Sequence, residues 1–298
     1  MNLYEQRSSN IRRTWALVLG FLVVVIAVGY VISWYYGNSF ILYIAVFIAL
    51  ATNFYAYWQS DKLVLSMNHA RLASREEFFD LYTVTENLAI TAGLSKPKLY
   101  IIDDPAPNAF ATGRDENHAV VCATTGLLAM LSRPELEGVI AHELSHIKNR
   151  DILLMTVAVV LAGFVAIVAD IFLRTSLHGG SRSDSDGKAN TLFIILAVVG
   201  IILAPIAAKL IQFAVSRRRE FLADASGALL TRYPEGLASA LEKISSHNVP
   251  MRHANHATAH LFIDEPFGKP EGGKLAWLER MFSTHPPVSD RIKALLNK

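Results

Sequence analysis

The stretch SRPELEGVIAHELSHIKNRD, residues 132–151, predicts a capped helix that carries a metal-binding pattern. Ser132 suits the N-cap position, and Glu135 stands three residues later, where its side chain completes a capping box. Pro134 lies where the first turn of a helix favours proline. A helix that begins here runs through HELSH, residues 142–146, and therefore holds these side chains on a regular element.

HELSH on a helix predicts a zinc hydrolase. His142 and His146 are four residues apart, so both imidazoles lie on one face and can bind one ion. Glu143 then lies within reach of a water on that ion. It can take the water's proton, so that hydroxide attacks a polarised peptide carbonyl. The alternative is a polar helix face with two surface histidines.

Four apolar stretches predict helical hairpins in a membrane. The chain is 52% hydrophobic with a mean hydropathy of +0.31, more apolar than an average soluble domain. Residues 15–34 and 39–58 contain no charged residue, and each is long enough as a helix to cross a hydrocarbon layer of about 30 Å. Residues 152–169 and 191–208 predict a second pair, for which the alternative is a buried hairpin in a soluble domain.

Basic residues predict the orientation of these spans. They lie before the first span, after the second and after the fourth: Arg7, Arg12, Arg13, Lys62, Arg71, Arg75 and residues 217–219. The positive-inside rule places them in the cytoplasm, so we expect a multi-pass protein of the cell (inner) membrane with its catalytic part facing the cytoplasm. The expected order is a transmembrane hairpin at 1–58, a catalytic block with HExxH at 59–151, a second hydrophobic hairpin at 152–215 and a catalytic block with the third ligand at 216–298.

A catalytic zinc usually takes three protein ligands and a water, so a third ligand is expected elsewhere in the chain. Glu220 is the candidate, because two crossings separate it from His146 and return both residues to one side. Asp224 shares a helix face with Glu220 and can accept the ring N–H of a ligating histidine. The alternative is a solvated helix on which Glu220 pairs with an arginine.

Charge and cysteine content exclude other classes of protein. The net charge of +2 offers no field that would indicate a nucleic acid partner. The single cysteine, Cys122, cannot form an internal disulfide or a thiolate metal site, which fits a reducing compartment.

Four motifs and the two apolar pairs resemble the HtpX-type heat-shock membrane metalloproteases, relatives of the CAAX prenyl endopeptidases. The motifs are NAFATG at 108–113, HELSH at 142–146, EFLAD at 220–224 and THPP at 284–287. The resemblance covers nearly the whole chain. It implies one zinc ion held by His142, His146 and Glu220, Glu143 as the catalytic base, and quality control of misfolded or damaged membrane proteins under stress as the task.

The resemblance also implies roles for residues outside the metal site. The segment beside the cleft, which can hold substrate as an added strand, comprises Asn108, Ala109, Phe110 and Ala111; local pattern alone favours a loop after Pro107. His285 can donate to the tetrahedral oxyanion, although its loop also suits the cap of a final helix. Arg291 can orient that loop or pair with a carboxylate.

Weaker local patterns complete the expected fold. A helix is expected over 76–92 with Gly93 as its C-terminal cap, and short strands over 98–102 and 119–122. The expected class is α+β, a mainly helical, zincin-like metalloprotease domain with a small β-sheet, attached to transmembrane helical hairpins. Asp151 is expected to cap the start of the third span.

A second metal site is the less favoured interpretation of three further histidines, His253, His256 and His260, because no carboxylate or cysteine accompanies them. Their segment is expected to be a polar loop or a wall on the substrate side of the cleft.

Three other functions remain open beside the zinc endopeptidase. A prenyl-protein endopeptidase would use the same chemistry. An intramembrane protease would carry HExxH inside an apolar span, whereas here Arg133, Glu135 and Lys148 flank it. A zinc-binding membrane adaptor that cuts nothing would not need Glu143.

Overall fold

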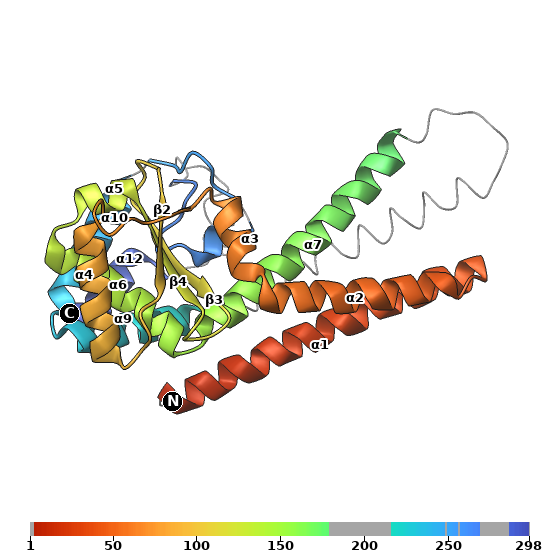
Figure 1. Ribbon diagram of the computed structural model, residues 1–298, viewed down its shortest axis with the longest axis horizontal. Helices are drawn as coiled ribbons and strands as arrows, with labels where there is room; N and C mark the ends of the chain where they lie inside the picture. Colours follow the sequence, from red (N-terminus) through yellow and green to blue (C-terminus); the bar gives the residue numbers. More distant parts are fainter. Residues whose placement is uncertain (1–2, 179–215, 248, 256, 269–285, 298) are drawn as a thin grey trace.

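The protein has a globular part and a set of long helices that extends from it (Figure 1). The structure is a computed structural model, and it describes residues 3–178, 216–247, 249–255, 257–268 and 286–297. Within these residues the fold is mainly helical with one four-stranded mixed sheet. The predicted α+β class is confirmed.

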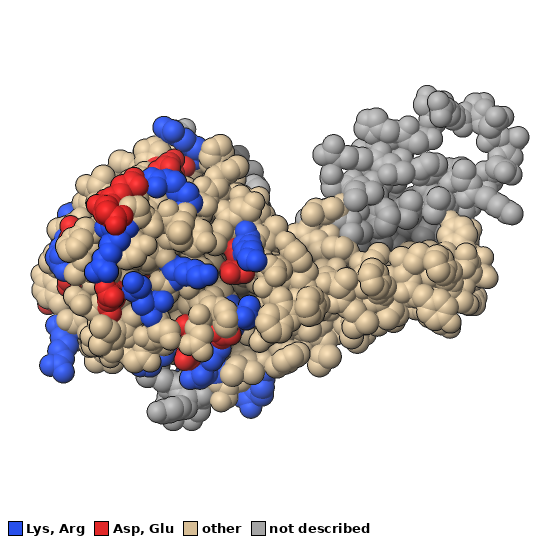
Figure 2. Space-filling model, viewed as in Figure 1, with Lys and Arg blue, Asp and Glu red and all other residues tan. Residues whose placement is uncertain are grey.

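The first two helices form an apolar hairpin. α1 (Leu3–Tyr36) and α2 (Phe40–Trp58) meet at a turn where Gly37 adopts a φ of 61°, which glycine tolerates without strain. In the described part of the chain, these two helices are long and apolar enough to cross a membrane. Trp34 and Phe47 are 75% and 72% exposed, an arrangement that suits contact with lipid. On the face shown in Figure 2, charged side chains gather on the globular part.

The third long helix, α7 (Asp151–His178), overlaps the stretch predicted over 152–169. The first half of α7 is buried against the hairpin, where Leu154 belongs to the same apolar cluster as Leu17 of α1. Figure 1 shows α7 extending on the same side of the globular part as α1 and α2. The predicted fourth stretch, 191–208, lies outside the described residues.

The sheet has four strands, which are β1 (Arg71–Leu72), β2 (Lys98–Ile102), β3 (Ala109–Gly113) and β4 (Ala119–Thr124). Their order is β1-β2-β4-β3, with β2 parallel to β4 and β3 antiparallel to β4 at one edge. The strand predicted over 98–102 is confirmed, and the strand predicted over 119–122 continues to Thr124.

β3 corrects the loop that local pattern favours after Pro107. All five of its residues are buried, because both α6 (Arg133–Lys148) and α7 contact the strand. A strand that is covered on both faces shows no alternation of apolar and polar residues, so its periodicity does not reveal it.

α6 lies within the globular part, with other helices packed around it. The remaining elements are α3 (Ser60–Met67), α4 (Phe79–Ala92), α5 (Thr125–Met130), α9 (Arg217–Thr231), α10 (Pro234–Ser246), the 3₁₀ helix η2 (Ala259–Leu261) and α12 (Val288–Leu296). The capping box of Ser132 and Glu135 is confirmed at the start of α6. Gly93 caps α4 as predicted, with a φ of 70°, although α4 begins at Phe79 and not at residue 76.

Glu135 also joins α6 to α10. One carboxylate oxygen accepts from Ser239 Oγ at 2.6 Å, and the other accepts from Lys243 Nζ at 2.8 Å and from the backbone N–H of Ser132 at 2.8 Å. Burial alone would raise the pKa of Glu135, but these hydrogen bonds outweigh burial and lower the pKa to about 2. The carboxylate therefore stays charged and fixes the start of the helix that carries HELSH.

Candidate metal centre

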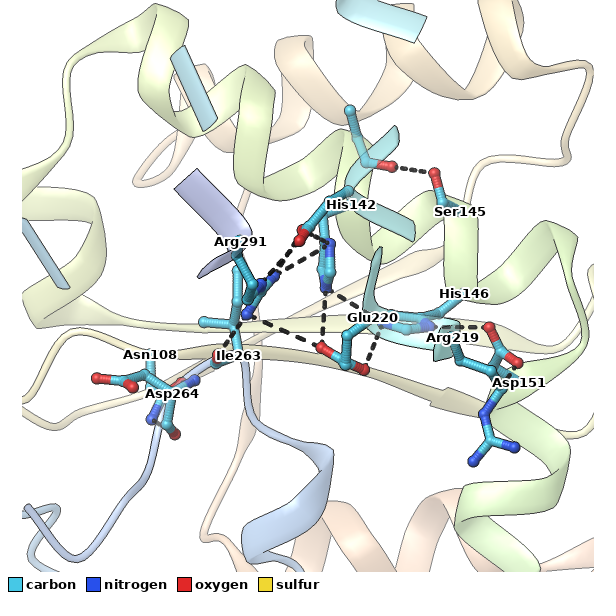
Figure 3. A network of polar contacts seen from close by, with 12 residues as sticks. Asn108, His142, Ser145, His146, Asp151, Arg219, Glu220, Ile263, Asp264 and Arg291 are labelled. Atoms are coloured by element: carbon cyan, nitrogen blue, oxygen red, sulfur yellow. Dashed lines mark hydrogen bonds and ion pairs between the residues drawn. The ribbon is translucent and has the colours of Figure 1, made fainter. Parts of the chain in front are cut away.

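Three side chains from two helices converge at one point (Figure 3). His142 Nε2 and His146 Nε2 of α6 are 3.1 Å apart. Glu220, in the first turn of α9, places Oε1 3.5 Å from His146 Nε2 and Oε2 3.8 Å from His142 Nε2. All three residues are buried, and their ligand atoms lie within 4.8 Å of one another.

The donor set fits a zinc ion. Atoms about 2 Å from a tetrahedral zinc lie roughly 3.3 Å from one another. The two Nε2 atoms are 3.1 Å apart, and each of them lies near that spacing from one of the two Glu220 oxygens, at 3.5 Å from Oε1 for His146 and 3.8 Å from Oε2 for His142. Two imidazole nitrogens and one carboxylate oxygen leave a fourth position for a water or a substrate, as in catalytic zinc sites. The structure therefore joins His142, His146 and Glu220 into a metal site typical of a zinc peptidase.

A glycine lets the two ligand-bearing helices approach. Gly227 lies on α9 against the backbone of α6, where an added Cβ would lie 3.0 Å from the backbone nitrogen of His142. Only a residue without a side chain fits this contact without moving a helix. Glu220 is thereby brought to the histidine pair.

His142 is oriented by a buried carboxylate and arginine. Its Nδ1 lies 2.9 Å from Asp224 Oδ1, which leaves Nε2 toward the metal position. Arg291 of α12 binds Asp224 in a bidentate pair, with 2.8 Å from Nε to Oδ2 and 2.7 Å from Nη2 to Oδ1. Of the two predicted roles of Arg291, the structure shows the pair with a carboxylate.

The charge of Asp224 is maintained by these partners. Burial by itself would raise the pKa of Asp224, but the charge of Arg291 and the hydrogen bonds from Arg291 and His142 hold it below its usual value. Asp224 therefore remains an acceptor for the imidazole N–H.

His146 has a carboxylate partner that the sequence interpretation missed. Asp151 Oδ2 lies 3.0 Å from His146 Nδ1, and Asp151 is fully buried at the first residue of α7. The local sequence predicts only a helix cap for Asp151. The sequence feature that could have revealed this partner is an acidic residue five positions after the second histidine of HELSH.

The proton affinity of His146 is set by its acidic neighbours. Burial alone would lower the pKa of His146, yet the hydrogen bond to Asp151 and the charges of Glu220 and Glu143 outweigh burial and raise the pKa to about 9. A cation bound here would replace that proton, since a metal takes the neutral imidazole.

Glu143 lies on the same helix between the two ligands and is only 2% exposed. Burial raises the pKa of Glu143, partly offset by the neighbouring His142 and His146. Burial is the main cause that raises the pKa of the Cys122 thiol on β4, and the negative charge of Glu143 raises this pKa further. Glu143 is therefore a buried carboxyl on the helix that carries both histidines.

The segment 108–111 lies beside this site, and part of it is already paired. The backbone N–H of Ile263 donates to Ala109 O at 2.9 Å, and Asn108 Nδ2 donates to the carbonyl of Asp264 at 2.9 Å. Arg291 Nη1 donates to Ile263 O at 3.3 Å (Figure 3). Asn108 thus holds the chain after η2, while Ala109, Phe110 and Ala111 belong to the edge strand β3.

Other predicted residues fall elsewhere. His285 and His256 lie outside the described residues. His260 is buried, and the exposed His253 has its ring 4.6 Å from that of His69. Among the residues that the structure describes, the histidine and glutamate group of α6 and α9 is the one metal-binding group of three or more.

The family follows from sequence comparison. The model of Peptidase family M48 matches residues 75–298, which is more than half of the chain. The chain belongs to peptidase family M48. It is 48% identical to the Protease HtpX homolog of Caldanaerobacter subterraneus subsp. tengcongensis, covering 98% of this chain and 97% of that protein. The homolog of Pyrococcus furiosus is 47% identical over 94% of this chain and 93% of its own length.

A solved structure shares the fold of this M48 peptidase. S. mikatae Ste24p matches with a TM-score of 0.53 at 18% identity, covering 98% of this chain and 67% of that protein. The family match, the HtpX-type relatives and the metal site together identify the chain as an HtpX-type M48 metallopeptidase. It is a membrane protein that hydrolyses peptide bonds.

Proposed function

We propose that this metallopeptidase is a zinc endopeptidase with one zinc ion per chain and Glu143 as its general base. The convergence of His142, His146 and Glu220, with Glu143 buried on the same helix, carries this proposal. When bound, zinc supplies a Lewis acid for the scissile carbonyl and for the attacking water.

The protein's own groups then have separate tasks. Glu143 takes a proton from the attacking water and delivers it to the leaving amine, and its raised pKa suits both transfers. Asp224 and Asp151 hold the two imidazoles through their Nδ1 atoms. His285 remains the proposed donor to the oxyanion, a role that rests on the family resemblance.

The edge strand β3 is the proposed docking site for substrate backbone. Asn108 O accepts from the N–H of Thr124 in β4, and antiparallel pairing then alternates along the strand. The backbone groups of Ala111 are therefore directed away from β4. An extended substrate can add there as a strand, which would bind sequences of many kinds because backbone atoms supply the hydrogen bonds.

The proposed substrates are misfolded or damaged membrane proteins near the cytoplasmic face of the inner membrane. The metal site supports this choice because Asp151, the partner of His146, is also the first residue of α7. The site thus lies where the long helices join the globular part, close to segments that emerge from a bilayer. The blocks 59–151 and 216–298 are the proposed catalytic parts, and the proposed orientation rests on the placement of Lys and Arg.

The other candidate functions have less support. α6 packs within the globular part and is not one of the long projecting helices, which disfavours an intramembrane protease (Figure 1). A purely structural zinc site would normally close with a fourth protein ligand and would not need Glu143. A prenyl-protein endopeptidase has the same expected chemistry and is separated from the proposal by its substrate.

The test compares wild type, Glu143→Gln and Glu137→Gln at matched zinc content. Glu137 is on the same helix but partly exposed, and its side chain pairs with Arg133 at 3.5 Å, so its variant controls for loss of a carboxylate. We expect wild type and Glu137→Gln to cleave an unfolded membrane protein, and Glu143→Gln to bind zinc without cleaving.

Three results would contradict the proposal. Cleavage by Glu143→Gln at the wild-type rate would remove Glu143 as base. Folded, zinc-loaded wild type that cleaves nothing would favour the adaptor. Cleavage restricted to a prenylated peptide would favour the prenyl-protein endopeptidase.

A further inference from the structure

The Asp151 carboxylate is held from two sides. Its Oδ2 lies 3.0 Å from Nδ1 of the metal ligand His146, and its Oδ1 accepts from Asn10 Nδ2 at 2.6 Å. Arg219 Nε is further away, 3.5 Å from Oδ1. Asn10 belongs to α1, so a hydrogen-bonded chain runs from the first membrane helix to the metal site.

We propose that Asn10 is a positioning residue for the metal site, acting through Asp151 on His146. This inference rests on the metal site of the proposed function. It makes the first hairpin part of the site as well as a membrane anchor.

The place of Asn10 on α1 supports the proposal. Asn10, Thr14, Leu17 and Phe21 are buried at successive helical spacings and form one stripe on α1. Leu17 and Phe21 pack in the apolar cluster shared with α7. A fully buried amide at the end of this stripe needs polar partners, and the Nδ2 group of Asn10 finds two acceptors in the connection between α6 and α7.

Asn10 holds both sides of a sharp turn. Its Nδ2 also donates to the carbonyl of Asn149 at 2.9 Å. Between Asn149 and Asp151 stands Arg150, whose φ of 60° lies in the left-handed region that a residue with a side chain adopts only at a cost. One amide group therefore bridges Asn149, the residue that caps the end of α6, and the first residue of α7, and it fixes where Asp151 stands relative to His146.

The size of the effect follows from this indirect role. Loss of a group that holds a ligating histidine typically lowers metal affinity by about 10- to 100-fold. Asn10 is one hydrogen bond further away, so we expect its loss to weaken zinc binding by roughly tenfold, the lower end of that range.

The experiment measures the zinc dissociation constant of the full chain in detergent, by competition with a chelator, for Asn10→Ala and Asn10→Leu. Leucine branches at the same carbon as asparagine and suits the apolar stripe, so it removes the hydrogen bonds without the cavity that alanine leaves at this buried position. Thr14→Val is the matched control, because Thr14 is buried one turn later and donates only to Asn10 O of its own helix. Thermal unfolding is followed in parallel to show that each variant is folded.

The same measurement in an Asp151→Ala background separates positioning from general support of the fold. If Asn10 acts through Asp151, replacing Asn10 in the Asp151→Ala protein weakens zinc binding little further. If the two residues act independently, their fold-losses in zinc affinity multiply. The expected result is a roughly tenfold loss for Asn10→Leu, no change for Thr14→Val and no further loss in the double variant.

Wild-type zinc affinity in folded Asn10→Leu would overturn the proposal, and so would a full additional loss in the Asp151→Ala background. Absence of zinc binding by wild type would instead refute the proposed function, so the two failures are distinguishable.

Discussion

Replacing Arg291 by methionine tests whether the buried pair behind His142 holds the site together. Arg291 is fully buried, and its two hydrogen bonds to Asp224 are 2.7 and 2.8 Å long. The substitution keeps much of the apolar volume but leaves the Asp224 carboxylate without its counter-charge inside the protein. Removing one partner of a buried ion pair typically costs about 3–5 kcal/mol.

That cost gives a measurable shift in unfolding. For a chain of this size each kcal/mol lowers the midpoint temperature by about 2–4 °C, so Arg291→Met should melt roughly 10 °C below wild type. This shift in the midpoint temperature is measured by thermal unfolding of the detergent-solubilised proteins at equal zinc content.

Two further variants make the prediction specific. Arg133→Met removes an arginine whose side chain is 45% exposed and lies 3.0 Å from Asp80, and we expect a loss under about 1 kcal/mol. Asp224→Asn combined with Arg291→Met removes the unpaired charge and should recover part of the stability.

An Arg291→Met protein that melts within about 2 °C of wild type, like Arg133→Met, would refute the reasoning. So would a double variant as unstable as the sum of its single changes, because the cost would then not come from an unpaired carboxylate.

Three further outcomes are expected. The lowered pKa of Glu135 means that its pairing with Lys243 stabilises the fold above the ordinary pKa of 4.5 and that this contribution is lost as the pH falls toward about 2. Glu135→Gln should therefore be less stable than wild type by about 2 kcal/mol at neutral pH, with the difference shrinking in denaturation curves taken below pH 4.5. Gly227→Val should force α9 away from His142 and lower the zinc content measured after dialysis, and an unchanged content would contradict the contact. Glu220→Ala should lose zinc to a chelator well before wild type, since two imidazoles alone hold the ion weakly.

Local patterns in the sequence predicted much of the site. The capping box and the four-residue spacing of the histidines depend only on neighbours along the chain, so the helix that carries HELSH could be foreseen. The third ligand, Glu220, needed the family resemblance and the topological argument, because it comes 74 positions after His146 (220 − 146). Its convergence with the histidines requires the contact that Gly227 permits.

Other contacts had no counterpart in local pattern. β3 is buried on both faces and lacks the alternation that marks a half-exposed strand. Asp151 could be seen in the sequence, but its role depends on the turn at Arg150, which directs the carboxylate toward His146.

Residue types and their local spacing predict the chemistry of this protein: His142 and His146 stand four residues apart with Glu143 beside the first, and apolar stretches are long enough to cross a membrane. How the metal-binding residues are held depends instead on contacts between residues far apart in the chain. Asn10 and Asp151 lie 141 positions apart in the chain, and Asp224 and Arg291 lie 67 apart. Such pairs form because packed helices leave buried polar groups that need partners, and a partner is chosen by proximity in space, which spacing along the chain does not encode.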